Sequence, residues 1–547
     1  MLHAVNEFDF IIVGAGSAGC VLANRLSASG EHTVLLLEAG GSDQRFWLKA
    51  PIGYGKSFYN PEVNWMYRTA PDPGLAGRQG YWPRGKVLGG SSSINAMVFV
   101  RGQAADFDAW AAMGNTGWGW NDVLPWFKKL EDSAHGPSAF RGKGGPMSVS
   151  DVSQAVHPLC AAFLQAGEQA GLPRSADLNG EQTEGVGTYQ ITTRKGLRAS
   201  ASTAYLRPAT GRANLEVRPH AHVLQVLFKG STATGVRYRA GQHTHEVRAR
   251  REVLLSAGAI NSPQLLLLSG VGPGAHLNDL GIPVVADLPA VGNHLQDHLC
   301  IDHLYRSRVP SLNNELGPWH AKLWAGLRYI SMRKGPLALS VNQAGGFARS
   351  RAGLTAPNLQ LYFSPLSYIR ARPGKRELMM PDPYAGFLLG AQPCRPTSRG
   401  SLGLRSPDPM APPLIAPNSL ATAHDRQEML EATVFLRRLA ASPALVAVIE
   451  KELVPGPSVD SDEALVEDIR QRASTVFHPV STCRMGTTVA DSVVNSRLQV
   501  HGLRGLRVID ASAFPCLTSG NTNAPTLMLA EKAADMVLQD HRNKVLS

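Results

Sequence analysis

Short apolar runs that end at glycine turns mark the N-terminal part of this chain. Residues 8–29 (FDFIIVGAGSAGCVLANRLSAS) begin with an apolar stretch at 10–13, which leads through a glycine-rich turn into a segment with helical spacing of apolar positions. Residues 33–40 (TVLLLEAG) form a second apolar run. Runs of this length, bounded by glycine, are typical of buried parallel strands. We therefore predict strand, turn, helix and strand, the beginning of an α/β domain.

Later segments repeat this pattern and predict a return to the same domain. Apolar runs at 220–228 (HAHVLQVLF), 252–259 (EVLLSAGA) and 505–515 (GLRVIDASAFP) predict strands, and the third strand ends in an acidic residue. Residues 520–539 predict a helix, because Pro525 fits its first turn and apolar residues recur on one face behind it.

The middle of the chain predicts a second domain with a different kind of sheet. Alternating apolar and polar residues at 358–363 (NLQLYF), and the segment 400–406 (GSLGLRS), favour strands of an antiparallel sheet. Residues 316–330 (LGPWHAKLWAGLRYI) favour a packed helix over an access lid. The apolar residues at helical spacing in that segment are Trp319, Leu323, Leu327 and Ile330.

Composition fits a globular protein with at least two cooperating domains. The chain has 547 residues, 44% of them hydrophobic and 18% charged, and one hydrophobic core rarely serves a chain of this length. The formal charge of +11 is scattered along the chain, without basic residues interleaved with aromatics as on nucleic-acid surfaces. We expect a core that can bury a large cofactor and no nucleic-acid partner.

Cysteine usage and hydropathy predict a cytoplasmic protein. The six cysteines lie far apart and outside any CxxC pair, which predicts free thiols in a reducing compartment. The N-terminal residues lack the pattern of a cleaved signal, and no run of about 18 uncharged apolar residues occurs. Residues 368–381 (YIRARPGKRELMMP) mix four cations with Leu378, Met379 and Met380. That mixture leaves peripheral contact with a membrane or with an electron-accepting partner as the alternative to a flexible loop.

The first glycine turn carries a dinucleotide motif. Gly14, Gly16 and Gly19 complete GxGxxG, in which successive glycines allow the tight turn, the approach of a pyrophosphate and close helix packing. The helix N-terminus then offers free N–H groups to the phosphates. Glu38 follows Gly19 by nineteen residues, where a carboxylate accepts hydrogen bonds from ribose hydroxyls. The pattern predicts a bound dinucleotide, either NAD or FAD.

Two further segments favour FAD. Residues 82–102 (WPRGKVLGGSSSINAMVFVRG) contain Gly89 and Gly90 before three serines, a loop whose backbone can press on a flat ring system and place Asn95 beside it. The helix predicted at 520–539 would direct the positive end of its dipole at the pyrimidine end of a flavin and stabilise the reduced anionic ring.

With these motifs the chain resembles the glucose-methanol-choline (GMC) oxidoreductase family along nearly its full length. Within that family it resembles the choline-dehydrogenase-like and FAD-dependent alcohol-dehydrogenase-like branch. The segments that carry the resemblance are the GxGxxG turn with Glu38, residues 85–102 (GKVLGGSSSINAMVFVRG) and residues 258–272 (GAINSPQLLLLSGVG). The resemblance implies an oxidoreductase that binds FAD.

The resemblance also implies the architecture, an α/β (α+β) fold with two domains. One is a discontinuous Rossmann-type FAD-binding domain, and the other is a substrate-binding domain built on an antiparallel sheet flanked by helices. We expect the FAD-binding domain at 1–155, 202–300 and 484–547, and the substrate-binding domain at 156–201 and 301–483.

The same resemblance assigns residues to the cofactor. Val223 would contact the adenine part and Ala257 would lie near the cofactor. The implied set of cofactor contacts is Gly14, Gly16, Ser17, Ala18, Gly19, Glu38, Ala39, Trp65, Gly89, Gly90, Ser92, Asn95, Ala96, Met97, Val98, Val223, Ala257, Asp510, Ala511, Asn523, Pro525 and Thr526.

By the resemblance, His478 in FHPVSTCRMG (477–486) lies over the reactive edge of the flavin, with Asn523 as the second catalytic residue. The chemistry agrees, since a neutral imidazole, with a pKa of about 6.5, can accept the proton of an alcohol. Asn523 would hold the same oxygen by a hydrogen bond. A zinc site with Cys483 and a buried structural histidine are the alternatives, and zinc normally requires three or four clustered ligands. We expect no metal.

Two departures from the family pattern bear on cofactor attachment and substrate. Ile94 stands where covalently flavinylated members have a histidine, which predicts noncovalent FAD. Gln343, in NQAGGF at 342–347, stands where choline-oxidising members are expected to have a glutamate, and Phe347 lies in the same substrate segment. A neutral amide loses the ion pair with a trimethylammonium group, so an uncharged alcohol is favoured over choline; packing of Gln343 away from any ligand is the alternative.

Together these features predict FAD-dependent oxidation of a primary alcohol to an aldehyde. His478 would abstract the hydroxyl proton, the carbon would deliver hydride to flavin N5, and the electrons would pass to a quinone or another carrier. The alternatives are an alcohol oxidase that reduces O2 to H2O2, a choline dehydrogenase and, least favoured, a hydroxynitrile lyase.

Overall fold

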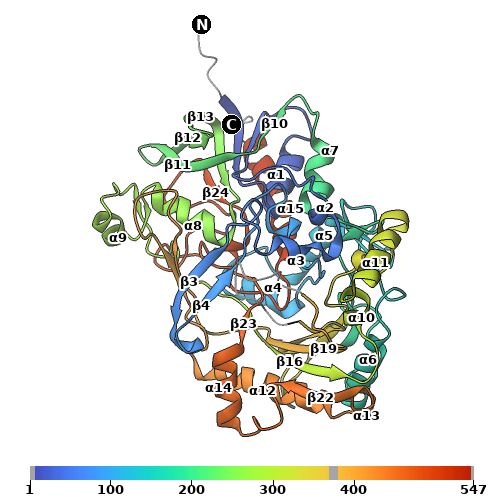
Figure 1. Ribbon diagram of the computed structural model, residues 1–547. Coiled ribbons are helices and arrows are strands. Elements are labelled where there is room, and N and C mark those ends of the chain that lie inside the picture. The colour runs from blue at the N-terminus through green and yellow to red at the C-terminus, as the bar shows by residue number, and fades with distance from the viewer. Residues whose placement is uncertain (1–6, 369–379, 544–547) are drawn as a thin grey trace.

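The computed structural model describes residues 7–368 and 380–543, which form two layers, each built on a seven-stranded sheet. Figure 1 shows one layer above the other, with both ends of the described chain at the upper layer. The mixed α/β architecture predicted from the apolar runs is confirmed.

The upper sheet is parallel in its centre and is extended by an antiparallel hairpin. Its order is β10–β2–β1–β13–β12–β11, and β24 also pairs with β13. The strands β1 and β2 are buried through their centres, as expected of parallel strands covered on both faces. The bounds are β1 Glu7–Val13, β2 Val34–Leu37, β10 Leu215–Arg218, β11 Ala221–Lys229, β12 Thr232–Ala240, β13 His243–Leu255 and β24 Leu506–Val508.

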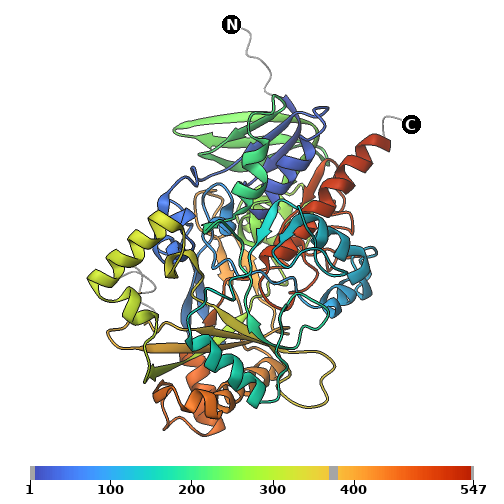
Figure 2. The ribbon, with the colours of Figure 1, turned by 90° about the vertical axis from the view of Figure 1, so that its right-hand side faces the viewer.

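Helices from opposite ends of the chain pack together beside this sheet. These are α1 (Ser17–Leu26) and α15 (Asn523–Asn543). The hydroxyl of Ser17 donates to Oδ1 of Asn523 at 2.8 Å, so the two helix N-termini lie side by side. Figure 2 shows α15, in red, running from the periphery toward the middle of the molecule.

The lower sheet is antiparallel, in the order β22–β16–β19–β18–β17–β7, with β23 paired to β16. Helices cover its far face (Figure 1), where Leu361 and Phe363 join their core, whereas Tyr362 belongs to a separate core on the other face. The strands are β7 Gly185–Thr188, β16 Leu299–Ser307, β17 Ala344–Ala348, β18 Leu359–Ser364, β19 Gly386–Pro393, β22 Ile449–Val454 and β23 Ser474–Thr475. The helices are α6 Leu159–Gln169, α12 Ala423–Ala440, α13 Pro443–Val446 and α14 Asp462–Arg472.

Shorter elements connect the layers. The other helices are α2 Phe46–Lys49, α3 Tyr54–Ser57, α4 Ala104–Ala112, α5 Trp120–Leu130, α7 Arg207–Ala209, α8 Gly258–Leu268, α9 Gly274–Asp279, α10 Leu312–Leu316 and α11 Trp319–Met332. The other strands form two-stranded ribbons: β3 Tyr67–Asp72, β4 Arg78–Trp82, β5 Glu131–Ser133, β6 Met147–Val149, β8 Thr193–Arg194, β9 Leu197–Arg198, β14 Val271–Gly272, β15 Ala286–Asp287, β20 Ser401–Gly403 and β21 Leu414–Ala416. Among the described helices, none combines the length and hydropathy needed to cross a membrane. All six cysteines are free thiols, as predicted.

Three sequence predictions need correction or fall outside the described residues. The segment 400–406 does not join the lower sheet, because β20 pairs with β21 and buries Leu402 in the core of the upper layer. The helix at 316–330 exists as α11, but its apolar stripe is exposed and the helix packs instead through Ala325 and Tyr329. Most of 368–381, including Leu378 and Met379, lies outside the described residues.

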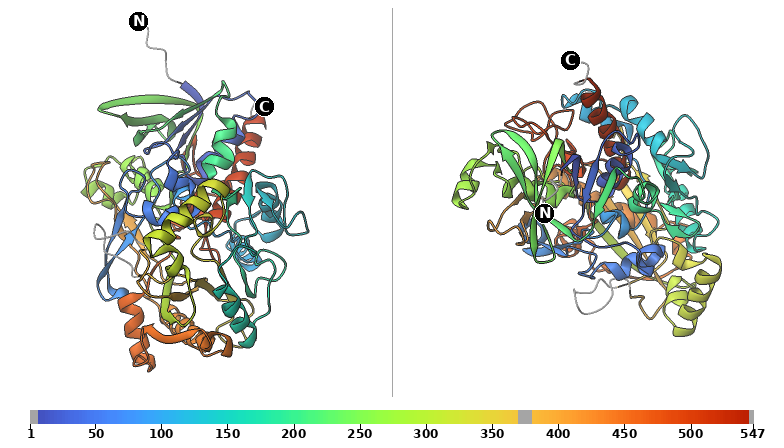
Figure 3. Two further views of the ribbon diagram at one scale, coloured as in Figure 1. Left: turned by 45° about the vertical axis from the view of Figure 1, so that its right-hand side comes forward. Right: turned by 90° about the horizontal axis from the view of Figure 1, so that it is seen from above.

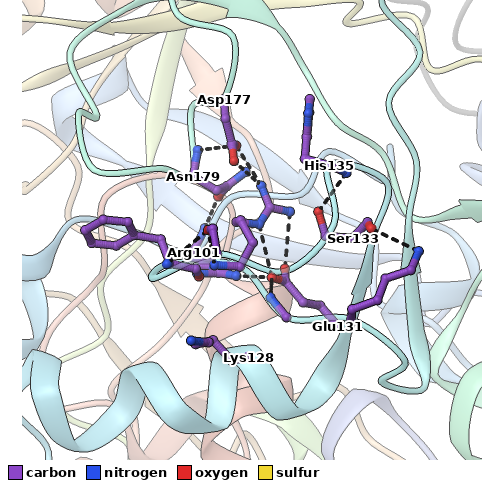
Figure 4. Close-up of polar contacts among 12 residues, drawn as sticks. Arg101, Lys128, Glu131, Ser133, His135, Asp177 and Asn179 are labelled. Carbon is purple, nitrogen blue, oxygen red and sulfur yellow. Dashed lines mark hydrogen bonds and ion pairs between the residues drawn. The ribbon is translucent and has the colours of Figure 1, made fainter.

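A buried cluster of charges fixes the chain that follows the Gly89–Gly90 turn. Figure 4 shows Glu131 accepting a hydrogen bond from Arg101, and Glu131 also accepts from Nε of Arg141 at 3.0 Å. Arg141 in turn pairs with Asp177 at 2.6 Å. Because removing one partner leaves an uncompensated buried charge, which costs about 3–5 kcal/mol, this network holds the backbone near Arg101 in a single position.

Candidate active site

A cavity of about 510 Å³ lies between the two sheets. Its upper wall comes from the turn between β1 and α1, the end of β2 and the start of α15, and its lower wall comes from residues of β16, β18 and β19. A cavity of this size is typical of cofactor and small-molecule sites.

The turn after β1 has the shape that a dinucleotide needs. Gly14 has φ +96°, and a Cβ at this position would come within 2.7 Å of the carbonyl oxygen of Ser256. A Cβ on Gly19 would lie 1.9 Å from the Gly14 carbonyl, so only glycine lets α1 approach the strand. The N-cap Gly16 has no capping side chain, and the first N–H groups of α1 therefore remain available to an anion.

Glu38 sits at the end of β2 with both carboxylate oxygens oriented by the backbone. Oε2 accepts from the N–H of Ala15 at 2.9 Å, and Oε1 accepts from the N–H of Gly40 at 2.8 Å. Burial raises the pKa of Glu38 to about 7, against the effect of these two donors. A carboxylate keeps lone pairs beyond those already used, so Glu38 can still accept the hydroxyl hydrogen bonds of a ribose.

Most predicted cofactor residues line this cavity. Those in its wall are Gly14, Gly16, Ser17, Ala18, Glu38, Ala39, Trp65, Gly90, Asn95, Ala96, Met97, Val98, Val223, Ala257, Asp510, Ala511, Asn523 and Thr526. Gly19, Gly89, Ser92 and Pro525 are not among its lining residues. Ser92 shapes the wall indirectly, since its hydroxyl donates to the carbonyl of Gly89 at 2.6 Å. The glycine cradle, the helix N-terminus and Glu38 together fit a dinucleotide such as FAD.

His478 lies in the lower part of the cavity, opposite a second histidine. The segment 474–480 runs antiparallel to 296–300, because β23 pairs with the start of β16 and Gln296 bridges Val480. This register brings the Nδ1 atoms of His298 and His478 within 3.0 Å. Nε2 of His478 faces Nδ2 of Asn521 at 3.2 Å.

Burial sets the charge state of His478. Its side chain is buried, and burial, aided by the nearby His298 and Arg84, holds the pKa of His478 well below 6.5. The ring is therefore neutral at neutral pH, which is the form that can accept a proton.

The hydrogen bonds of His298 fix which nitrogen of His478 carries hydrogen. Nε2 of His298 lies 2.9 Å from the carbonyl of Cys394, and a carbonyl can only accept, so this nitrogen is the protonated one. Burial lowers the pKa of His298 to about 4, so the ring is neutral and its Nδ1 accepts from Nδ1–H of His478. Nε2 of His478 is therefore unprotonated, and its lone pair accepts a hydrogen bond from Nδ2–H of Asn521 at the cavity.

The structure pairs His478 with Asn521 instead of Asn523, the residue that the sequence predicted as its catalytic partner. Oδ1 of Asn523 accepts from Ser17 at the contact between α1 and α15. The amide of Asn521 is oriented by Gln360, whose Nε2 donates to Asn521 Oδ1 at 3.2 Å. The N–H side of Asn521 is therefore directed at Nε2 of His478. Asn523 keeps its other predicted place, in the wall of the cavity.

Asp297, Arg84 and a strained backbone hold His478 in position. Asp297 accepts from the backbone N–H of His478 at 2.7 Å, and Arg84 donates to the carbonyl of Phe477 at 3.1 Å. Phe477 has φ +71°, a conformation that costs about 1–3 kcal/mol in a non-glycine residue and is often found at functional sites. Burial raises the pKa of Asp297 to about 7, and Arg84 opposes that rise.

The substrate residues predicted from sequence are not in the cavity wall. Gln343 is buried, and its Oε1 accepts from the backbone N–H of His157 at 2.7 Å. Phe347 is buried in the small core that also contains Tyr362. The wall contains neither of them, and Asn342 is the lining residue of that segment. Gln343 thus does not reach the cavity as predicted, and its neutral side chain gives no reason to disfavour choline.

Other residues, not predicted, complete the lower wall. Alternate residues of β16 place Cys300 and Asp302 at the cavity, and Tyr54, Phe58, Tyr59 and Tyr362 add aromatic rings. Within residues 7–368 and 380–543, no three His, Cys, Asp or Glu side chains are grouped to hold a metal ion.

Known proteins are similar to this chain in sequence and in fold. The chain matches a family model described as GMC oxidoreductase in two parts, residues 8–300 and residues 396–530. An oxygen-dependent choline dehydrogenase of Photobacterium profundum is 44% identical over 539 residues, which cover 97% of this chain and 93% of the relative. An alcohol dehydrogenase [acceptor] of Pseudomonas putida is 44% identical over 541 residues, covering 97% and 96%.

A solved structure has the same fold as this chain. A formate oxidase of Aspergillus oryzae RIB40, studied for the effect of a mutation on FAD modification, superposes with a TM-score of 0.90. It is 26% identical and the match covers 98% of this chain and 99% of that protein.

Proposed function

Because the chain belongs to the GMC oxidoreductase family, as its motifs predicted, we propose that it oxidises a primary alcohol to an aldehyde with His478 as the base. Membership makes it an FAD-dependent oxidoreductase that acts on CH–OH donors. The alcohol, the base and its partner are the parts that we propose.

The observation that carries the proposal is the convergence of Nε2 of His478 and Nδ2 of Asn521, 3.2 Å apart, at the cavity. An alcohol that replaced this hydrogen bond would place its oxygen against both atoms, donate its proton to the histidine lone pair and accept a hydrogen bond from the amide. As the proton leaves, the Asn521 N–H stabilises the negative charge that develops on the oxygen.

The remaining residues hold this pair and the cofactor. Bound FAD would supply the hydride acceptor, flavin N5. The glycine turn, Glu38 and the N-terminus of α1 would hold its dinucleotide part. When His478 takes the proton at Nε2, its Nδ1–H stays hydrogen-bonded to His298, which we propose as a positioning residue that keeps the reactive nitrogen unprotonated beforehand.

The test is anaerobic mixing of the purified holoenzyme with a panel of primary alcohols while the visible absorbance of the flavin is followed. We expect bleaching by at least one class of uncharged primary alcohols, because His478 is already in its basic form at neutral pH. A flavin that stays oxidised with every alcohol, although dithionite reduces it, would contradict the proposal.

Choline is the second candidate, favoured by the wall of the cavity. Asp302 of β16 lies there with the rings of Tyr59 and Tyr362, and a carboxylate and aromatic faces attract a quaternary ammonium group. Choline therefore belongs in the same panel. Bleaching by choline but not by uncharged alcohols of similar size would assign choline as the substrate, and the reverse would exclude it.

We further infer that FAD is held without a covalent bond. Ile94 lines the cavity at the position where the sequence predicts the tether in flavinylated relatives, and an aliphatic side chain forms no bond to a flavin. Denaturing the yellow enzyme in acid and precipitating the chain should leave all flavin absorbance in the supernatant. Flavin that stays with the precipitated polypeptide would contradict this inference.

We infer that the electrons pass to a quinone or another carrier, with O2 as the alternative that peroxide formation would reveal. A cytoplasmic location, with one face at a membrane, is compatible with transfer to a quinone.

We also propose a division of the chain into an FAD-binding domain (1–155, 202–300, 484–547) and a substrate-binding domain (156–201, 301–483). The membership of the strands supports this division, because the strands of the upper sheet fall in the first set of ranges and almost all lower-sheet residues fall in the second.

A further inference from the structure

The outward side of α11 carries large apolar side chains that the fold leaves in solvent. Trp319, Leu323, Leu327 and Ile330 are 77%, 57%, 52% and 63% exposed. Their spacing of three and four residues places them on one stripe of the helix. In Figure 3, right, α11 (yellow) lies at the outer edge of the molecule seen from above. We call these four residues the α11 stripe.

The stripe is not needed to hold α11 on the protein. The helix packs through Ala325 and Tyr329, both buried, on roughly the opposite side. The ring of Tyr329 contacts Phe46 of α2 with 6.1 Å between ring centroids, and Phe46 and Trp47 are themselves exposed. The stripe thus has no part in packing α11 on the protein, and large apolar side chains gathered at the surface in this way mark an interaction site.

The surroundings of the stripe are positively charged. Lys322 and Arg328 lie on its two sides, Arg333 and Lys334 follow the helix, and all four are exposed. Residues 311–338 contain these four cations and a single acidic residue, Glu315. An apolar stripe of Trp, Leu and Ile bordered by Lys and Arg is typical of a helix that lies in the interface of an anionic membrane.

We propose that α11 docks this enzyme on the surface of a phospholipid bilayer that contains anionic lipid. The stripe would enter the boundary between headgroups and acyl chains, and the four cations would face the lipid phosphates. A second copy of the chain is a poorer occupant, because a two-fold interface sets identical patches against each other and would bring the same cations together.

Docking would set the cavity close to the lipid. Ala325 of α11 belongs to a small core against which Tyr54 and Tyr368 pack, and both tyrosines line the cavity. The helix α11 and this small core therefore lie between the α11 stripe and the cavity wall. The proposal does not depend on the identity of the substrate, since binding to lipid is measured without turnover.

The test is flotation of the holoenzyme with vesicles of phosphatidylcholine, with and without phosphatidylglycerol. We expect flotation with the mixed vesicles, and a partition coefficient reduced by about 100-fold in the double variant Leu327→Glu with Ile330→Glu, because two apolar contacts are lost. Arg328→Ala should lower binding to the mixed vesicles by about 5-fold. The double variant should oxidise a water-soluble alcohol with a dye acceptor as the parent does, which shows that it folds.

The matched control is Val434→Glu with Val446→Glu, which adds the same charge at exposed apolar positions of α12 and α13 and should bind vesicles like the parent. Failure of the parent to float, equal flotation of the α11 variant, or equal binding to neutral and anionic vesicles would overturn the proposal. So would a parent dimer, seen by light scattering, that the α11 variant dissociates, because a second copy would then cover the stripe.

Discussion

Replacing His478 with alanine should leave FAD bound and slow anaerobic flavin reduction by alcohol about 10²- to 10⁴-fold, the contribution of a well-placed general base. The side chain is buried, lines the cavity and presents an unprotonated Nε2 there. The cofactor's dinucleotide contacts come from another wall, so the flavin spectrum should persist. Stopped-flow absorbance with saturating alcohol measures the effect.

His303→Ala is the matched control, because His303 is equally buried in β16 but does not line the cavity. A pH series adds a second readout. Since burial holds the pKa of His478 well below 6.5, the reduction rate should stay level as the pH falls from neutrality to 6.5 and should decline only at lower pH, when the base becomes protonated. Undiminished reduction in His478→Ala would refute the assignment. A decline centred near pH 7 would instead report Asp297 or Glu38, whose pKa values burial raises to about 7.

Replacing Asn521 with alanine should slow the same step about 10²- to 10³-fold, the usual cost of losing one donor to a developing oxyanion. Its N–H side faces Nε2 of His478 and is held there by Gln360. Asn523→Ala is the matched comparison two residues away. That variant removes the contact with Ser17, so we expect weaker FAD retention with little change in the reduction rate of the bound flavin. The opposite ranking would restore Asn523 to the catalytic role.

The elements around the cofactor were predictable because their sequence signals are local. The apolar run of β1, the glycine turn and α1 follow each other directly. Glycine is required at Gly14 and Gly19 because a Cβ at either position would clash with neighbouring backbone atoms. Glu38 was predictable for the same reason, since it ends the next strand. These features require no knowledge of distant residues.

The residues around His478 were harder to predict because distant segments position them. Asn521 and Asn523 share one short motif, and only the contact of α15 with α1 decides that Asn523 turns to Ser17 while Asn521 turns to His478. His298 had no signal of its own, because its role arises from the pairing of 296–300 with 474–480. The orientation of Gln343 was equally hard to predict. Its neighbour Asn342 lines the cavity, whereas the side chain of Gln343 accepts a hydrogen bond from the backbone of His157.

The helix α11 shows why periodicity alone does not locate a core. The spacing of Trp319, Leu323, Leu327 and Ile330 correctly predicted a helix. It could not say which side of that helix meets the protein, because an apolar stripe that enters a core and one that enters a lipid interface have the same period.

The order of strands in the upper sheet has a consequence for the synthesis of this protein. β1 pairs with β2 and with β13, β13 pairs in turn with β24 at Leu506–Val508, and α1 packs on α15, which starts at Asn523. Ser17 after the glycine turn and Asn523 at the start of α15 are 506 positions apart in the chain, so a ribosome delivers them at widely separated times. Because domains normally fold as they emerge, this nucleotide cradle must wait until α15 has been synthesised, so the cradle can capture its cofactor only after that point.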